Sequence, residues 1–149
     1  MAKAFSTGFI LNAPFRDKSL RKEAFKLEKR ILVFEGGESL RLRKSAIDEG
    51  INGMLRVMNY LGMISQAPEP TQVSAIIDVS SWIRARSAGL HFAKVRNGSA
   101  VKKKQILGVV SDPFGSYALD IKSPVDGFIL GLNNNPVVNR GDALFHIGH

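Results

Sequence analysis

The sequence Ile31-Leu-Val-Phe-Glu-Gly-Gly-Glu-Ser39 places one carboxylate at the end of a short apolar run. The first four residues are β-branched, aliphatic or aromatic, a pattern typical of a strand covered on both faces. Gly36 and Gly37 remove two side chains next to Glu35 and permit backbone angles that other residues avoid. The pattern predicts a buried strand that delivers Glu35, as a candidate general base, onto a glycine turn. The alternative is a strand that simply ends in a polar turn.

A helix is predicted on each side of this strand. Residues Ser19 to Leu27 form a short amphipathic pattern in which Ser19 is the N-cap. Residues Ser45 to Leu61 form a longer pattern, and Gly62 follows where a left-handed C-cap is expected. The apolar residues of the longer helix have the spacing of one buried stripe, which consists of Ile47, Ile51, Met54, Leu55 and Met58.

The longer helix contains two internal glycines, Gly50 and Gly53. Each costs about 1 kcal/mol relative to alanine unless a close-packed neighbour needs the space. Helix, strand and helix make one α/β unit, and one such unit cannot bury its own faces. The first part of the chain is therefore expected to need a partner surface.

A proline-rich segment, Ser65-Gln-Ala-Pro-Glu-Pro-Thr71, marks a boundary because two prolines within three residues disfavour both helix and strand pairing. We predict one domain in residues 1–66 and a β-rich domain in residues 67–149. Short strands at this spacing indicate a small barrel or sandwich, and the whole chain is predicted to be α+β. The predicted strands are Val73–Val79, Gly89–Val95, Ile106–Val110, Ala118–Ile121, Gly127–Leu130 and Ala143–Ile147.

The β-rich part contains an internal repeat. Ala88-Gly-Leu-His-Phe92 and Ala100-Val-Lys-Lys-Lys-Gln-Ile-Leu107 match Asp126-Gly-Phe-Ile-Leu130 and Val137-Val-Asn-Arg-Gly-Asp-Ala-Leu144. With one residue of slip the two halves are about 37 residues apart. The repeat predicts a pseudo-symmetric arrangement of strands.

Composition excludes several classes of protein. The 149 residues carry a net charge of +8 and no cysteine, which excludes disulfides and thiolate metal sites and suits a cytoplasmic protein. No apolar run approaches the roughly 20 residues that span a bilayer, and the N-terminus lacks a signal-peptide pattern. The basic residues are scattered and have no interleaved aromatic residues, so nucleic-acid binding ranks last among the functions considered.

The β-rich part resembles the biotinyl/lipoyl-like barrel-sandwich fold. The resemblance rests on Val101-Lys-Lys-Lys-Gln-Ile-Leu107, Ser123-Pro-Val-Asp-Gly127 and Arg140-Gly-Asp-Ala-Leu144. In carrier proteins of that class a lysine at the central hairpin tip holds the cofactor. The corresponding hairpin here, Ser111-Asp-Pro-Phe-Gly-Ser116, has no lysine, so the resemblance implies a structural or gating role.

The chain as a whole resembles the C-terminal part of succinylglutamate desuccinylase/aspartoacylase family proteins. The motifs that carry this resemblance occur in the family's order from about Phe5 onward. They are Leu32-Val-Phe-Glu-Gly-Gly-Glu-Ser-Leu40, the segments Gly50–Leu55 and Leu61–Ile64, Trp82-Ile-Arg-Ala85, Asp112-Pro-Phe-Gly115 and Gly141-Asp-Ala-Leu-Phe145.

This resemblance implies a specific activity. Family members have a zinc carboxypeptidase-like α/β domain followed by a β-rich domain, and they hydrolyse the amide bond of N-acyl amino acids. Zinc, held by a His-x-x-Glu pair and a later histidine, activates the attacking water, and a glutamate on a late strand transfers the proton. By position, Glu35 matches that glutamate. Arg41 and Arg43 are weaker candidates for binding an anionic substrate.

The sequence also departs from the family. No His-x-x-Glu occurs, and the three histidines are His91 in a predicted strand and His146 and His149 in an expected frayed tail. Any zinc ligands are therefore expected outside this chain, which alone is not expected to catalyse the reaction. The expected partners are a small-molecule substrate and either an upstream catalytic half or a second copy. The alternative function is a non-catalytic barrel-sandwich interaction module.

Overall fold

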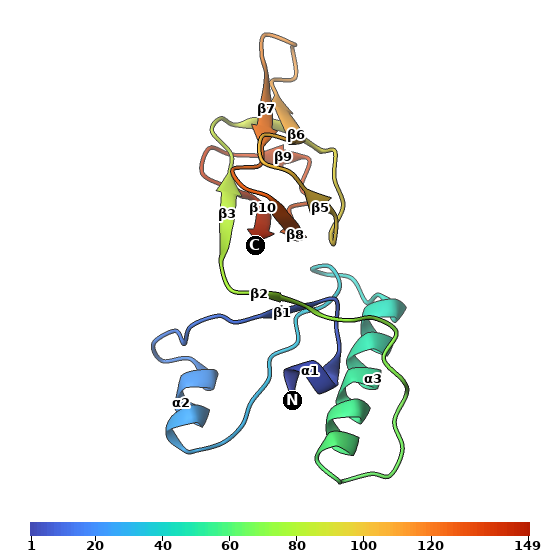
Figure 1. Ribbon diagram of the computed structural model, residues 1–149. Coiled ribbons are helices and arrows are strands. Elements are labelled where there is room, and N and C mark those ends of the chain that lie inside the picture. The colour runs from blue at the N-terminus through green and yellow to red at the C-terminus, as the bar shows by residue number, and fades with distance from the viewer. The chain divides into compact units, whose positions relative to one another are not determined.

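The computed structural model describes all residues from Met1 to His149 and divides into two compact units, Met1–Ile76 and Ile77–His149 (Figure 1). Each unit has its own packing and is described by itself. The sequence-based boundary between residues 66 and 67 stays a prediction. No helix in the structure is both long and apolar enough to cross a lipid bilayer.

The first unit combines three helices with a two-stranded sheet. The two strands are joined through the Ala75 N–H, which donates to the Gly8 carbonyl at 2.9 Å, and nearby the Ser74 hydroxyl donates to the Thr7 carbonyl at 2.6 Å. The elements are α1 (Ala2–Phe5), β1 (Phe9–Leu11), α2 (Leu20–Lys26), α3 (Lys44–Tyr60) and β2 (Ala75–Ile77), and β1 pairs with β2.

The two predicted helices and their caps are confirmed. The Ser19 hydroxyl accepts a hydrogen bond from the Lys22 N–H at 3.2 Å at the start of α2. At the end of α3, Gly62 has a φ of +72°, and the Met63 N–H donates to the Met58 carbonyl at 2.9 Å. This is the left-handed ending that glycine favours, and it satisfies a carbonyl that the helix itself leaves unpaired.

The two internal glycines of α3 make room for two aromatic rings. A Cβ at Gly53 would lie 2.4 Å from Phe5 Cε1, and a Cβ at Gly50 would lie 3.0 Å from Phe34 Cε1. The two ring centroids are 5.2 Å apart and their planes are tilted by 36°. Arg56 secures the first ring, because its Nε and Nη2 donate to the Phe5 carbonyl at 3.0 and 2.7 Å. The close-packed neighbours that would justify glycine in this helix are therefore Phe5 and Phe34.

The predicted strand Ile31–Phe34 is wrong. The segment is irregular, because a strand needs a partner for its backbone hydrogen bonds and none of the chain's strands pairs with it. It is also not covered, since Val33 keeps 58% of its surface exposed. The apolar stripe of α3 is similarly open, with Ile47, Ile51 and Met54 between 46% and 55% exposed. One face of this unit thus lacks a cover.

The second unit consists of two four-stranded antiparallel sheets around one core. One sheet has the order β3-β10-β8-β5 and the other has the order β7-β6-β4-β9. The strands are β3 (Ser80–Arg84), β4 (Gly89–Ala93), β5 (Ala100–Val101), β6 (Ile106–Ser111), β7 (Ala118–Lys122), β8 (Gly127–Leu132), β9 (Val137–Val138) and β10 (Ala143–Gly148).

The internal repeat predicted from the sequence is confirmed by this topology. The two sheets have the same order once equivalent strands are exchanged. The equivalent pairs are β3 and β7, β4 and β8, β5 and β9, and β6 and β10. The matched glycines also have the same role. A Cβ at Gly89 would lie 2.3 Å from the Ser111 carbonyl oxygen, and one at Gly127 would lie 2.2 Å from the Gly148 carbonyl oxygen. Each half thus needs glycine where its second strand, β4 or β8, approaches the backbone of its last strand, β6 or β10.

The buried polar residues of the second unit are His91 and Ser123, and His91 is the titratable one. His91 on β4 stands at the repeat position of Ile129 on β8, and it is 6% exposed. Its ring meets Phe145 edge-on at 5.4 Å, and its Nε2 has no hydrogen-bond partner. The fully buried residues around it include Leu107, Ile129, Leu144, Phe145 and Ile147.

The expectation of a frayed C-terminal tail is wrong. His146 lies in β10, which pairs with both β3 and β8. The last residue is also fixed, since His149 and Val79 exchange backbone hydrogen bonds of 2.9 and 3.2 Å. Central pairing in the sheet outweighs the usual disorder of a chain end.

We predict that Gly53→Ala destabilises the protein even though alanine favours helix. The helix would gain about 1 kcal/mol, but the new methyl group would overlap the Phe5 ring, and overpacking costs about 1–3 kcal/mol. Thermal unfolding followed by circular dichroism measures the balance. Asn52→Ala, on the same helix but outside the groove that these rings line, serves as the control. A Gly53→Ala protein more stable than the wild type would contradict this packing.

We also predict that the second unit loses stability in mild acid through His91. Burial lowers the pKa of His91 below 6.5, and backbone hydrogen bonds at Asn133 and Asn135 oppose that shift only in part. The unfolded chain therefore binds the proton first. The free energy of unfolding is highest above about pH 6.5 and falls below it, by at most about 1.4 kcal/mol per pH unit.

The matched variant for this test is His91→Ile, which copies the residue that the other half of the repeat carries as Ile129. The paired strands β6 and β9 carry no charged side chain that would offset a protonated His91. Denaturant unfolding between pH 7.5 and 5 is expected to show a weaker pH dependence in the variant. Parallel profiles for the two proteins would contradict the role of His91.

Candidate functional site

Glu35 lies between two residues that line a groove, and it is itself exposed. Phe34 and Gly36 are on the groove wall, whereas Glu35 is not. The Phe34 ring folds over the following turn, so that a Cβ at Gly36 would lie 2.5 Å from Phe34 Cζ. Gly37 has a φ of +85°, which favours glycine. The two glycines thus let the chain turn tightly beside Phe34 and leave the carboxylate accessible.

The groove has a volume of about 560 Å³ and lies entirely within the first unit. It is formed by α1, the segment between residues 32 and 43, and the uncovered face of α3. Its walls are mostly apolar, and two arginines, Arg41 and Arg43, are the charged residues among them. The other lining residues are Met1, Phe5, Leu32, Phe34, Gly36, Gly37, Leu42, Ala46, Ile47, Gly50, Ile51, Met54 and Val57.

The two candidate substrate-binding arginines differ in their surroundings. Arg43 precedes the first turn of α3, and its Nη2 lies 2.6 Å from the Glu38 carboxylate. Arg41 is close to Glu38 through the main chain, because the Arg41 N–H donates to the Glu38 carbonyl at 3.2 Å. The two residues are joined by a turn in which Leu40 has a φ of +60°. Arg43 therefore already has an anionic partner, and Arg41 is the better placed of the two for an external anion.

The histidines do not form a metal site. His91 is buried in the core of the second unit, and His146 stacks on Trp82 with centroids 4.6 Å apart and its Nε2 3.0 Å from the Ser80 hydroxyl. No group of three or more histidine, cysteine or acidic side chains in the chain is arranged to hold a metal ion. The residues of this chain therefore do not fit a zinc centre.

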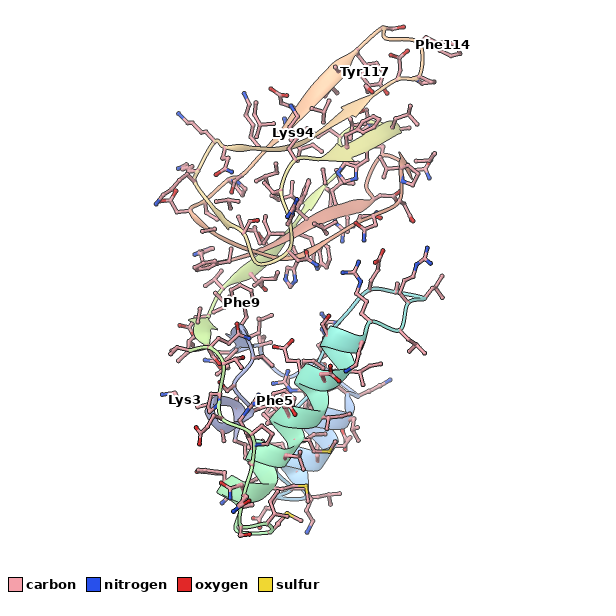
Figure 2. The ribbon with its side chains drawn as sticks, turned by 90° about the vertical axis from the view of Figure 1, so that its right-hand side faces the viewer. Lys3, Phe5, Phe9, Lys94, Phe114 and Tyr117 are labelled. Atoms are coloured by element: carbon pink, nitrogen blue, oxygen red, sulfur yellow. The ribbon has the colours of Figure 1, made fainter.

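The hairpin between β6 and β7 exposes an aromatic side chain at its tip. Phe114 is 91% exposed, and Figure 2 shows it at the far end of the hairpin, near Tyr117. The turn is braced from within. The Asp112 carboxylate accepts the Tyr117 N–H at 3.2 Å, the Tyr117 hydroxyl donates to the Ala88 carbonyl, and Gly115 has a φ of +82°.

Sequence reasoning missed the residues that shape the groove. Phe5 was not singled out, and Phe34 was assigned only to the strand. The signal that would have found them was the glycine pair Gly50 and Gly53, because two glycines in a long amphipathic helix indicate bulky neighbours. The structure thus adds an aromatic–glycine contact next to the predicted Glu35.

The sequence matches no family profile and no curated protein. Solved structures, in contrast, are similar over almost the whole chain. The ectoine utilization protein EutE (DoeB) from Ruegeria pomeroyi, in a product-bound structure, has a TM-score of 0.84 at 15% identity, and the match covers 98% of this chain and 46% of that one.

Two further structures carry names of the family that the sequence resembles. A succinylglutamate desuccinylase/aspartoacylase from Rhodobacter sphaeroides has a TM-score of 0.87 at 20% identity, and the match covers 99% of this chain and 47% of that one. A succinylglutamate desuccinylase from Silicibacter sp. TM1040 has a TM-score of 0.84 at 16% identity, covering 97% and 46%.

This chain spans about half the length of the three structures it matches. Similarity at such low identity establishes a shared fold and does not by itself assign an activity. At a coarse level, the predicted mixture of α and β structure with antiparallel sheets is confirmed. The fold of this chain is therefore the one seen in about half of each of these three structures.

Proposed function

We propose that this chain is the C-terminal part of a hydrolase that cleaves the amide bond of N-acyl amino acids, and that Glu35 is its proton-transfer group. The observation that supports this most is the position of Glu35. It is exposed beside a glycine turn, in a fold shared with desuccinylase/aspartoacylase structures over 97–99% of the chain. In this proposal residues 1–66 end the catalytic α/β domain, and residues 67–149 form a barrel-sandwich domain.

The chemistry assigned to Glu35 is proton transfer in amide hydrolysis. Its carboxylate accepts a proton from the attacking water as the new carbon–oxygen bond forms. The same carboxyl group then gives that proton to the leaving nitrogen as the carbon–nitrogen bond breaks. The products are a free amine and a carboxylic acid, which releases its remaining proton to solvent, so one glutamate serves as base and then as acid.

Zinc belongs to this proposal only through the complete protein. No group of residues in the chain fits a metal centre, and no His-x-x-Glu sequence is present. Zinc would thus be held by residues outside this chain. What the chain supplies is the carboxylate and the groove next to it.

The partners follow from the exposed groove. Its apolar wall needs a cover, which would be an upstream catalytic half or, without it, a second copy of this chain. Arg41 would bind the anionic end of a small substrate, and Arg43, paired with Glu38, would support it. We expect these partners in the cytoplasm and expect no role for nucleic acid.

A second function is favoured by one observation, the exposed Phe114 on its braced hairpin. A rigid aromatic side chain that stands free of its own domain is a suitable anchor for a protein partner. In this alternative the second unit is a non-catalytic interaction module. Binding that is lost in Phe114→Ser, without any hydrolase activity in the complete protein, would favour it.

We predict that Glu35→Gln in the complete protein lowers kcat by about 10²–10⁴-fold, the usual contribution of a general acid–base group. KM and zinc content are expected to remain close to the wild-type values, because the amide is isosteric and the zinc ligands lie elsewhere. Steady-state kinetics and metal analysis measure both. Glu23→Gln, an exposed residue of α2, is the control. Near-native turnover in Glu35→Gln would assign the proton transfer to another group.

We also predict that the 149-residue chain on its own self-associates through the groove. Light scattering coupled to gel filtration is expected to give a mass above 16.3 kDa that rises with concentration. Ile51→Glu would shift the chain toward monomer, because it places a charge on the apolar wall. A well-folded monomer at every concentration tested would contradict self-association through the groove.

A further inference from the structure

The Phe34 ring fills a notch whose sides are glycine backbone. One side is Gly36, where a Cβ would lie 2.5 Å from Phe34 Cζ, and the other is Gly50 of α3, where a Cβ would lie 3.0 Å from Cε1. A side chain at Gly36 would force the ring to move, whereas a Cβ at Gly50 would require it to shift by a few tenths of an ångström. The ring therefore joins the turn that follows Glu35 to the middle of α3.

The notch is closed from the side by a second ring. Phe5 occupies the space over Gly53, one helical turn along α3, and its centroid is 5.2 Å from that of Phe34. Figure 2 shows Phe5 beside α3. Arg56 holds the Phe5 carbonyl with two hydrogen bonds of 3.0 and 2.7 Å. The wall against which Phe34 rests is thus fixed to the same helix.

Side-chain packing alone holds the segment that carries Glu35. Residues 31–37 belong to no strand, and no hydrogen bond joins them to another element of the chain. The position of Glu35 is consequently set by its two neighbours. Phe34 is held by its ring, and Gly36 is held under that ring.

We propose that Phe34 is a positioning residue, and that its ring in the glycine notch of α3 fixes the place of the Glu35 carboxylate. This inference rests on the proposed function for its catalytic consequence. Gly50 has a part in this positioning, because a residue without a side chain lets the ring lie so close to the helix. A misplacement of about 1 Å at a reacting group costs about 100-fold in rate, so a displaced ring affects turnover rather than binding.

The first test needs no activity. The chain has no cysteine, so Glu35→Cys introduces one unique site for a nitroxide label in the full chain. Electron paramagnetic resonance then reports the mobility of residue 35. Gly50→Ala is expected to make the label at least twofold more mobile, because the new methyl group displaces the ring. Adding Phe34→Leu to Gly50→Ala is expected to restore the slower motion, because the smaller side chain leaves room for the methyl group.

Two further variants keep the test decisive. Phe34→Ala removes the ring without altering the helix and is expected to mobilise the label as well, which covers the case in which Gly50→Ala does not fold. Asn52→Ala, on α3 but outside the groove, is the matched control and is expected to leave the label unchanged. A label equally immobile in Gly50→Ala and Phe34→Ala would overturn the inference.

The kinetic test uses the complete protein with Glu35 intact. Gly50→Ala is expected to lower kcat by about 3–10-fold while KM changes less than about twofold, and Phe34→Leu is expected to recover most of the loss. An unchanged kcat in Gly50→Ala, or a loss of kcat that adding Phe34→Leu does not restore, would contradict the positioning of Glu35 by Phe34. If the wild-type protein hydrolyses no N-acyl amino acid but the label responds as expected, the positioning of residue 35 stands and the proposed function fails.

Discussion

Two phenylalanine rings packed on two glycines of α3 join both the N-terminal helix and the segment that carries Glu35 to α3. Complete burial of an aromatic side chain contributes about 1.5–3 kcal/mol, whereas each internal glycine costs the helix about 1 kcal/mol. Phe34 keeps 39% of its surface exposed, so it realises only part of that gain. The margin is therefore small. The unit is expected to be much more stable once its groove is covered, which agrees with the proposal that another polypeptide segment covers it.

The second unit depends on a different constraint, the exchange of strands between two similar halves. Each half contributes strands to both sheets, so neither half can form a complete sheet alone. The two halves differ in the core. His91 in one half takes the place of Ile129 in the other, and Gly108 makes room for the Phe145 ring. A histidine placed where its twin is isoleucine brings a titratable group into an otherwise apolar core. We therefore expect this group to couple the stability of the unit to pH.

Local signals in the sequence were sufficient for α2, α3, their caps and the repeat, but not for the short helix α1. Ser19 and Gly62 cap helices whose ends lie within a few residues of them, and the repeat is recognised from the regular spacing of matching residues. Predictions that depended on distant residues did less well. The segment Ile31–Phe34 has the composition of a strand, but a strand also needs a neighbour, and composition does not reveal one. A strand over Ala143–Ile147 is predicted from its composition, but the expectation of a frayed end at His146 and His149 overlooks the pairing of β10 with both β3 and β8.

The site was predictable to a similar degree. Glu35 was identified from its glycines, but its packing against α3 required the structure, because Phe34 and Gly50 are sixteen residues apart. The pairing of Arg43 with Glu38 was missed for a simpler reason: an ion pair across a turn depends on backbone angles such as the positive φ of Leu40. Residue type alone does not specify those angles.

The central claim is that this chain supplies the proton-transfer half of a larger hydrolase, and the intact mass of the native polypeptide tests it most directly. Antibodies against the second unit would recover the protein from its source cells, and mass spectrometry would give the mass of the intact polypeptide. We expect a mass of about twice 16.3 kDa, because the structures that the chain matches are about twice as long as the chain. A polypeptide of 16.3 kDa that carries no further segment would contradict it.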